Sequence, residues 1–140
     1  MKIVFYISVL FVAAITLGKP AMARSFTTVG IAKDTTKKII HPKEAMSDVE
    51  ASAILKAMQQ KNNDQEKLIV VKEQLKGKGI TMDQLIRLLN QFLTDDAKLE
   101  SAQYAFAYTT NYKSFLRVMD LFQQEGYKFK LEDYYDKHRK

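Results

Sequence analysis

The sequence predicts an all-α fold, a compact stack of three antiparallel helix pairs. First, a pattern of two apolar residues, one base and two more apolar residues recurs three times, as ILKAM at 54–58, LIRLL at 85–89 and FLRVM at 115–119. Second, serine or threonine precedes apolar stretches with Glu or Gln three residues later, which is typical of helix starts. Third, glycines separate the stretches, as expected of turns after helices.

The first 23 residues are typical of an export signal. Lys2 gives a positive start, residues 3–17 are almost entirely apolar, and Ala21-Met22-Ala23 is a small-x-small cleavage site. An apolar stretch of about 15 residues is shorter than the roughly 20 that span a bilayer. We therefore expect cleavage after Ala23 rather than a membrane anchor, and a periplasmic or secreted product without a transmembrane segment.

Composition limits the classes of function. The chain has no cysteine, which excludes disulfides, thiolate chemistry and the lipid-modified cysteine of a lipoprotein. Cleavage would remove Lys2 and Lys19 from the 22 bases and none of the 16 acids, leaving 20 bases and a net charge of +4. This surplus fits an anionic envelope surface, but it is too small for the dense basic patch of a nucleic-acid-binding protein.

Residues 24–47 show neither helical nor alternating periodicity, and His41-Pro42 disfavours a helix there. We expect a flexible or loosely packed leader, in which the apolar pair Ile39-Ile40 can still dock on the domain. The helical domain then occupies residues 48–140, with boundaries good to a few residues. Its six expected helices lie at 48–61, 64–76, 82–93, 96–109, 112–124 and 129–138.

The helix expected at 82–93 explains the pentapeptide. At 100° per residue, Leu85, Leu88 and Leu89 share one side, whereas Arg87 lies on the opposite side at about 200° from Leu85. Met82, Phe92 and Leu93 extend the same apolar face. The pentapeptide is therefore the buried stripe of an amphipathic helix with its base in solvent.

A second pattern indicates that each helix pair is one repeat of 30–32 residues. Lys67-Leu68, Lys98-Leu99 and Lys130-Leu131 follow the three pentapeptides. One pair cannot bury its own apolar face, so three pairs should share a core. The expected buried positions in the second helices are Leu68, Val71 and Leu75, then Leu99, Ala102 and Phe106, then Leu131, Tyr134 and His138.

The stretch TDDAKLESAQYAFAYTTNYKSFLRVMDLF, with the preceding MDQLIRLLNQF, resembles the domain of unknown function 4476 family, a group of exported bacterial proteins. The family's F-x-x-D-x-x-K-L-x-x-A-x-x-A-Y pattern is matched by Phe92, Asp95, Lys98, Leu99, Ala102 and Ala105, with Phe106 at the aromatic position. Tyr112, Val118 and Phe122 match its continuation. The resemblance implies an all-helical envelope domain over about residues 48–138, carries no catalytic residues, and gives Asp95 and Lys98 structural roles.

Few side chains are suited to catalysis. The two histidines, His41 and His138, lie in the leader and next to the end of the chain, and no metalloprotease, phosphate-loop, hydrolase or calcium-loop motif occurs. The acid pairs at 95–96 and 132–133 diverge by about 100° on a helix and lie near helix starts, where acids are favoured anyway. We expect no catalytic, cofactor-binding or metal-binding residues, and no cofactor.

Aromatic residues crowd the last third of the chain. Phe106, Phe115 and Phe122 fall on buried faces, whereas Tyr104 and Tyr108 lie together on another face of their helix. Such a tyrosine pair is a common contact surface for a protein or the flat face of a sugar, although packing against the neighbouring repeat explains it equally. The candidate binding surface comprises Tyr104, Tyr108, Tyr112, Lys98, Lys113 and Arg117.

Three bases recur at equivalent positions on the first helices: Lys56, Arg87 and Arg117. Because stacked helices lie about 8–10 Å apart, these bases form a candidate basic ladder for lipid phosphates or acidic polysaccharide. Solvated charge opposite an apolar stripe is the ordinary alternative.

The sequence thus predicts an exported, non-enzymatic helical interaction or scaffold module of the bacterial envelope, with an envelope protein as its partner. The alternative is a domain that binds a small molecule, an acidic glycan or an anionic lipid through the aromatic and basic surface of the last two repeats. Nucleic acid is not an expected partner.

Overall fold

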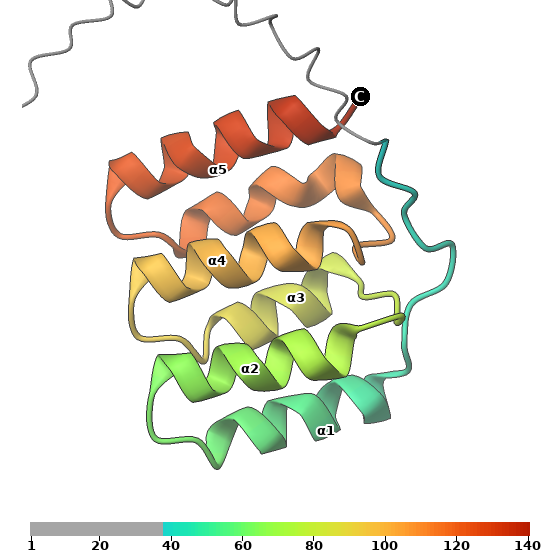
Figure 1. The fold of residues 1–140 in the computed structure, drawn as a ribbon, viewed down its shortest axis with the longest axis vertical. Coiled ribbons are helices and arrows are strands. Elements are labelled where there is room, and N and C mark those ends of the chain that lie inside the picture. Colours follow the sequence, from blue (N-terminus) through green and yellow to red (C-terminus); the bar gives the residue numbers. More distant parts are fainter. Residues whose placement is uncertain (1–37) are drawn as a thin grey trace, which may run out of the picture. The chain divides into compact units, whose positions relative to one another are not determined.

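The computed structural model describes residues 38–140, which form six helices in three consecutive pairs (Figure 1). Unit 1 contains α1 and α2, unit 2 contains α3 and α4, and unit 3 contains the 3₁₀ helix η1 and α5. The predicted all-α class is confirmed, and residues 38–140 contain one isolated bridge, Ile80 to Thr109, but no strand. The bounds are Asp48–Gln59 (α1), Asp64–Leu75 (α2), Met82–Leu89 (α3), Asp95–Phe106 (α4), Tyr112–Leu121 (η1) and Glu125–His138 (α5).

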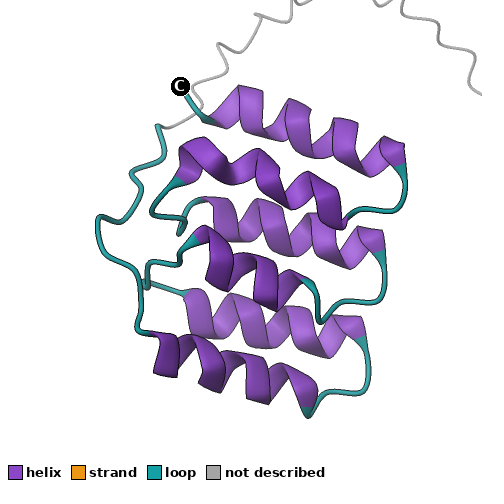
Figure 2. Ribbon diagram, turned by 180° about the vertical axis from the view of Figure 1, so that it is seen from behind, coloured by secondary structure: helices purple, strands orange, loops and turns teal. Residues whose placement is uncertain are grey.

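The helices form two layers. The first helices of the units, α1, α3 and η1, pack side by side in one layer, and the second helices, α2, α4 and α5, form the other (Figure 2). Each unit contacts the next through both layers. This is the predicted stack of helix pairs, in which no single pair could bury its apolar face alone.

The predicted helix starts are confirmed where the cap is local. Ser47 and Thr81 each accept a hydrogen bond from the backbone N–H three residues later, and Glu50 and Gln84 reach back to complete capping boxes. Asn63 and Thr94 cap α2 and α4 in the same way, without the return bond. These starts need only neighbouring residues, so the sequence predicts them directly.

Helices α3, α4 and η1 end three or four residues earlier than predicted. Helix α3 ends at Leu89 rather than 93, because the chain turns tightly there through hydrogen bonds from Gln91 to Leu88 and from Phe92 to Leu89. Phe92 stays buried, but the turn leaves Leu93 76% exposed instead of on the apolar face. Helix η1 is a 3₁₀ helix, and its N-cap residue Asn111 makes no side-chain cap.

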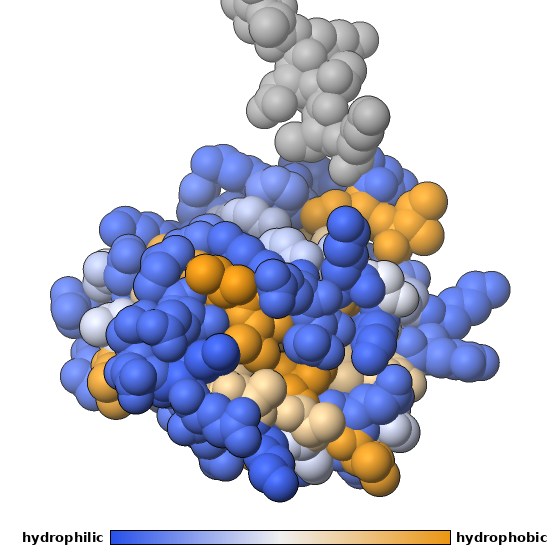
Figure 3. All heavy atoms as spheres, turned by 60° about the horizontal axis from the view of Figure 1, so that its bottom comes forward, coloured by the Kyte–Doolittle hydropathy of each residue, from blue (hydrophilic) through white to orange (hydrophobic). Residues whose placement is uncertain are grey.

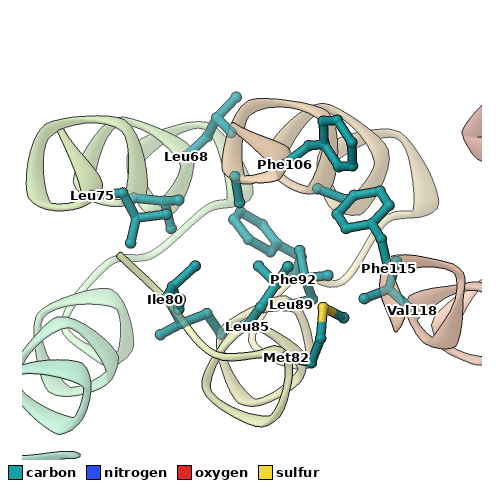
Figure 4. Packing of buried hydrophobic residues seen from close by; sticks show 14 of the residues in the cluster. Leu68, Leu75, Ile80, Met82, Leu85, Leu89, Phe92, Phe106, Phe115 and Val118 are labelled. Carbon is teal, nitrogen blue, oxygen red and sulfur yellow. The ribbon is translucent and has the colours of Figure 1, made fainter. Parts of the chain in front are cut away.

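The core lies between the two layers and contains the pentapeptide leucines. Leu85, Leu88 and Leu89 are fully buried while Arg87 is exposed, which confirms the helical wheel. Figure 4 shows Leu85 and Leu89 among the packed side chains of the core. Phe106 occupies the centre of an aromatic cluster, with its ring edge-to-face against four neighbours within 6 Å: Phe115, Tyr134, Tyr135 and His41. The aromatic crowding of the last third is therefore largely core.

An aspartate and a lysine on α2 hold unit 2 in place, and we call this arrangement the Asp–Lys clamp. The Asp64 carboxylate accepts hydrogen bonds from the backbone N–H groups of Leu93 and Thr94 at 2.9–3.0 Å, just before α4. Lys67 donates to the carbonyl of Gln91, 2.7 Å away, just after α3. The clamp therefore satisfies polar groups of the next unit's turn that no local partner reaches.

The clamp recurs between units 2 and 3. Asp95 accepts from the backbone N–H groups of Gln123 and Gln124, both at 2.9 Å, and Lys98 donates to the carbonyl of Leu121 at 3.0 Å. Helix α5 begins at Glu125 rather than at the expected residue 129, directly after the two residues whose N–H groups Asp95 of another helix bonds. The resemblance implied structural roles for Asp95 and Lys98. In the structure these two side chains bond the turn of the next unit, and neither of them caps α4.

Unit 3 carries a third copy, which meets no further unit within residues 38–140. Glu125 and Lys128 pair with each other at 2.6 Å, and the glutamate is largely exposed. The next residue, Phe129, is 66% exposed, whereas its counterparts Leu68 and Leu99 are buried. The equivalent of Lys98-Leu99 is thus Lys128-Phe129, and the predicted register through Lys130-Leu131 is wrong in this unit.

This register also corrects the predicted buried face of α5. Leu131 is buried as expected, but the second buried residue is Tyr135, while Tyr134 and His138 remain partly exposed. Leu131 and Tyr135 correspond to Ser101 and Ala105 of α4, which are also buried. The Tyr135 ring packs against Phe106 of unit 2 and Phe115 of its own unit, so the buried side of the last helix is the one that meets these two rings.

The other end of the stack is closed differently. In unit 1 the backbone N–H of Asn62, just before α2, donates to the Glu66 carboxylate of α2, 3.4 Å away. In units 2 and 3 the clamp of the preceding unit bonds the corresponding turn. Figure 3 shows an apolar strip bordered by polar residues on the face at the α1 and α2 end. Val49 and Ile69 are the exposed large apolar residues of these two helices. Terminal repeats with atypical surfaces are usual in repeat proteins.

Burial acts to raise the pKa of Asp64, but the hydrogen bonds from Leu93 and Thr94 and the nearby Lys67 outweigh it and lower the pKa overall. A carboxylate whose folded-state pKa lies below the unfolded value of about 3.9 stabilises the fold above that pH. The contribution disappears as the pH falls through the folded-state pKa. We therefore expect Asp64→Asn to be destabilising at neutral pH and to lose less stability than wild type below about pH 4.

Urea unfolding at several pH values measures this dependence. Asp96→Asn is the matched control, since Asp96 is an exposed acid in the first turn of α4. It should retain the wild-type pH profile. A profile for Asp64→Asn as steep as that of wild type below pH 4 would show that Asp64 is not the linked group.

Residues 38–47, part of the expected flexible leader, form a strap along one edge of the stack (Figure 1). Met46 is buried and its N–H donates to the carbonyl of Gly79 at 2.7 Å. Ile39 packs against the core, whereas Ile40 is 90% exposed. The leader's loosely attached character therefore does not extend to these residues. The expected signal at 1–23 and the leader residues 24–37 lie outside the described part of the chain.

None of the helices between residues 38 and 140 combines the length and the apolar character needed to cross a membrane.

Candidate functional site

Three segments of the chain meet at one edge of the stack, which we call the loop end. They are the strap, the α2–α3 loop and the α4–η1 loop. Ile80 donates its N–H to the carbonyl of Tyr108 at 2.8 Å, and the N–H of Thr110 returns to the carbonyl of Ile80 at 3.0 Å. These bonds fix loops from all three units against one another.

The α2–α3 loop depends on two glycines. Gly77 has a φ of +77°, a conformation that other residues adopt only with strain. At Gly79 an added Cβ would lie 1.9 Å from the carbonyl oxygen of Glu44, so only glycine lets the strap approach. The sequence indicated turns at both glycines, but only the tertiary structure shows that Gly79 is a contact with the strap.

A pocket of about 270 Å³ opens between the three segments. Its walls are mostly apolar, and Lys78, His41 and Tyr108 are the lining residues whose side chains carry polar groups. The lining residues are Ile40, His41, Pro42, Gly77, Lys78, Ala107 and Tyr108. We call it the loop-end pocket.

His41 forms one wall of the pocket and anchors the strap. Its ring stacks on Tyr112 with centroids 4.0 Å apart, and Nδ1 lies 3.1 Å from the carbonyl of Thr109. Since a carbonyl only accepts, Nδ1 carries the proton and Nε2 is the basic nitrogen of the neutral ring. Burial lowers the pKa of His41 despite the hydrogen bond to Thr109, so the ring is neutral at pH 7.

Tyr104 and Tyr108 lie side by side, as predicted, with ring centroids 5.3 Å apart. The Tyr104 hydroxyl donates to the carbonyl of Lys72 on α2 at 2.8 Å, and Tyr134 makes the equivalent bond to Gln103 on α4 at 3.0 Å. Burial, with the adjacent Tyr108, raises the pKa of Tyr104 to about 12. Tyr104 is therefore a link between units, and Tyr108 is the member of the pair that lines the pocket.

The remaining members of the candidate binding surface are not brought together. Lys98 is 8% exposed and occupied in the clamp, which corrects its expected role as a surface anion partner. One face of Tyr112 is covered by His41. Lys113 is exposed on η1.

The candidate basic ladder contains acids as well as bases. Arg87 pairs with Asp48 at 3.0 Å, and Arg117 pairs with Asp83 at 3.1 Å. Each pair joins the first helices of adjacent units, and all four side chains are largely exposed, so solvent screening leaves each pair with little effect on stability. Lys56, in unit 1, is exposed. The arginines thus face acids of the preceding unit rather than forming a uniform positive strip.

Sequence reasoning missed His41 and Lys78. His41 was expected to be a solvated leader residue, because contact between the strap and η1 spans about 70 residues and leaves no local pattern. The sequence signal that could have drawn attention to Lys78 is the Gly77-Lys78-Gly79 stretch, in which a base lies between two turn glycines. It indicated a turn but not the strap that crosses it.

The loop end brings together chemically different residues from three segments of the chain. His41 comes from the strap, Lys78 from the α2–α3 loop and Tyr108 from the α4–η1 loop, and the described residues that line the pocket include no acid. Within residues 38–140, no three His, Cys, Asp or Glu side chains lie close enough together to hold a metal ion.

Comparison with known proteins gives one match. A family model described as a domain of unknown function, DUF4476, matches residues 45–135, almost the whole helical stack. No curated protein and no solved structure matches the chain.

Proposed function

Since the chain belongs to the DUF4476 family, we propose that it is an exported, non-enzymatic interaction module of the bacterial envelope, which receives a protein partner at the loop end. Export is supported by the signal-like features of residues 1–23, namely the positive start, the short apolar stretch and the cleavage site before Arg24. A rigid helical stack suits this role, because its outer residues can vary without disturbing the core.

The observation that carries the proposal is Ile40. This side chain is 90% exposed although its neighbours Ile39 and His41 are packed against the helices. It lines an apolar pocket, so an exposed apolar residue and a recess lie side by side, next to a His41 side chain that is hydrogen-bonded to Thr109. Exposed apolar groups beside a recess are typical of protein contact sites.

The geometry favours this function over the alternative, a glycan or anionic-lipid binder that uses the three tyrosines. Stacking on a sugar requires free aromatic faces. Tyr112 is covered on one face by His41, and Tyr104 is tilted against Tyr108 and bonded to Lys72. Of the three tyrosines, Tyr108 alone lines the pocket.

A photo-cross-linking residue placed at position 40 tests the proposal in the bacterium that produces the protein. We expect one discrete protein adduct, and we expect Tyr108→Ala in the same chain to reduce its yield. The control is the same residue at position 93, because Leu93 is also an exposed aliphatic residue but lies in the α3–α4 turn at the opposite edge of the stack (Figure 1). Identical adducts from both positions, or none from position 40, would contradict a specific contact at the loop end.

A further inference from the structure

The loop-end pocket has the dimensions of a site for one side chain. Its volume of about 270 Å³ is below the range of roughly 300–1,000 Å³ typical of pockets for drug-sized ligands. Its walls come from the apolar atoms of Ile40, Pro42, Ala107 and the Tyr108 ring. A single amino-acid residue with an aliphatic or aromatic side chain therefore fits within it and displaces water from apolar surface.

The charge at the pocket is positive. Lys78 lines it and is held only by a pair with Glu50 at 3.4 Å, in which both side chains are partly exposed. Such an exposed pair is weak and exchanges readily for another carboxylate. The segments that build the loop end, residues 38–46, 76–80 and 107–111, carry four bases against the single acid Glu44: Lys38, Lys43, Lys76 and Lys78.

The other polar groups complete the recognition chemistry. Because Nδ1 of His41 donates to Thr109, its Nε2 remains to accept a hydrogen bond. The Tyr104 proton is directed at Lys72, so the Tyr108 hydroxyl, 3.4 Å from the Tyr104 oxygen, donates to it and keeps its own oxygen as an acceptor. The residues that line the pocket thus include one cation, Lys78, and two side chains with an acceptor left over, His41 and Tyr108, which suits an amide N–H beside a carboxylate.

We infer that the loop-end pocket binds an apolar side chain whose own residue carries a free carboxylate, as the carboxy-terminal residue of a partner protein does. This inference rests on the proposed function and adds the chemistry of the partner. The apolar side chain enters between Ile40, Pro42 and Ala107, and Lys78 exchanges Glu50 for the terminal carboxylate. The backbone N–H of that residue donates to the acceptors at the rim.

The test uses a matched pair of probes, N-acetyl-leucine and N-acetyl-leucinamide. They share the side chain and the acetyl amide and differ only in the carboxylate. The measurement is the shift of backbone amide signals of the protein, residues 24–140, in two-dimensional NMR. We expect saturable shifts at the signals of residues 77, 78, 107 and 108, with a Kd of about 1 mM for the acid and at least about tenfold weaker binding of the amide.

Two lysines of one loop provide the variants. Lys78→Met should abolish the preference for the acid, whereas Lys76→Met should keep it, because Lys76 is an exposed base of the same loop that does not line the pocket. Ala107→Phe, which fills the pocket, should abolish binding of both probes. Unchanged dispersion of the remaining signals shows that each variant is folded.

Several results would overturn the inference. Absence of saturable shifts for either probe up to about 50 mM rules out a side-chain pocket, equal affinity for acid and amide rules out carboxylate recognition, and an unchanged preference in Lys78→Met rules out its assigned role. An equal loss of preference in Lys76→Met shows general attraction to a basic loop. Cross-linking from position 40 does not depend on these NMR results. If the inference about the pocket fails, the cross-linking experiment therefore still tests the proposed interaction module.

Discussion

Replacing Phe106 by alanine is expected to lower the free energy of unfolding by about 3–5 kcal/mol, the usual cost of truncating a buried aromatic residue. Phe106 is fully buried on α4, and its ring contacts rings from η1, α5 and the strap. The truncation would leave a cavity between units 2 and 3 and remove the edge contact to His41. Since domains of this size have total stabilities of about 5–15 kcal/mol, the variant should be only marginally folded.

Urea unfolding followed by circular dichroism measures the change. Phe129→Ala is the control, because it makes the same truncation at a position that is 66% exposed, and it should stay within about 0.5 kcal/mol of wild type. Equal losses in the two variants would mean that Phe106 does not occupy the centre of the core. A loss in Phe106→Ala below about 1 kcal/mol would have the same meaning.

Asp95→Ala is expected to destabilise the protein by about 3–5 kcal/mol, because it breaks a buried ion pair and removes the acceptor for two backbone groups. Asp95 is 7% exposed, bonds the N–H groups of Gln123 and Gln124, and lies 3.5 Å from Lys98. The variant leaves the Lys98 ammonium buried with only the carbonyl of Leu121 as a partner. Helix α5 also loses the carboxylate at its start.

The equivalent change in unit 3 is the control. Glu125→Ala removes the acid of the third copy, which is exposed and meets no further unit among the residues described, so it should cost less than about 1 kcal/mol. Hydrogen exchange adds a local measurement, since Asp95→Ala should lose protection in the first turn of α5 before other helices do. Similar stability losses for the two acids would show that the clamp does not hold units 2 and 3 together.

The clamp gives the family pattern a physical meaning. In the D-x-x-K-L portion, Asp95 and Lys98 bond the turn of the next unit, and Leu99 is buried beside them. Asp64, Lys67 and Leu68 repeat this arrangement one unit earlier. The spacing reflects helix geometry, because residues three apart lie on the same side and point toward the same neighbour.

The sequence by itself determined the helices and their buried sides. Leu85, Leu88 and Leu89 fall on one side of a helix by rotation alone, and Ser47 and Thr81 cap their helices with residues three positions away. Such features depend on residues only a few positions apart, so the sequence pattern predicts them directly. The all-α class and the three-pair organisation follow from them.

The tertiary structure alone decided how the polar residues are used. Lys98, expected on the surface, is buried because its acceptor is the carbonyl of Leu121 in the next unit. His41, expected in solvent, is packed because its stacking partner Tyr112 lies about 70 residues away. The sequence pattern around a long polar side chain is the same whether that side chain is solvated or bonds a distant backbone group. The difference depends on which unit is stacked beside it, and that is fixed only when the apolar faces of all three pairs close into one core.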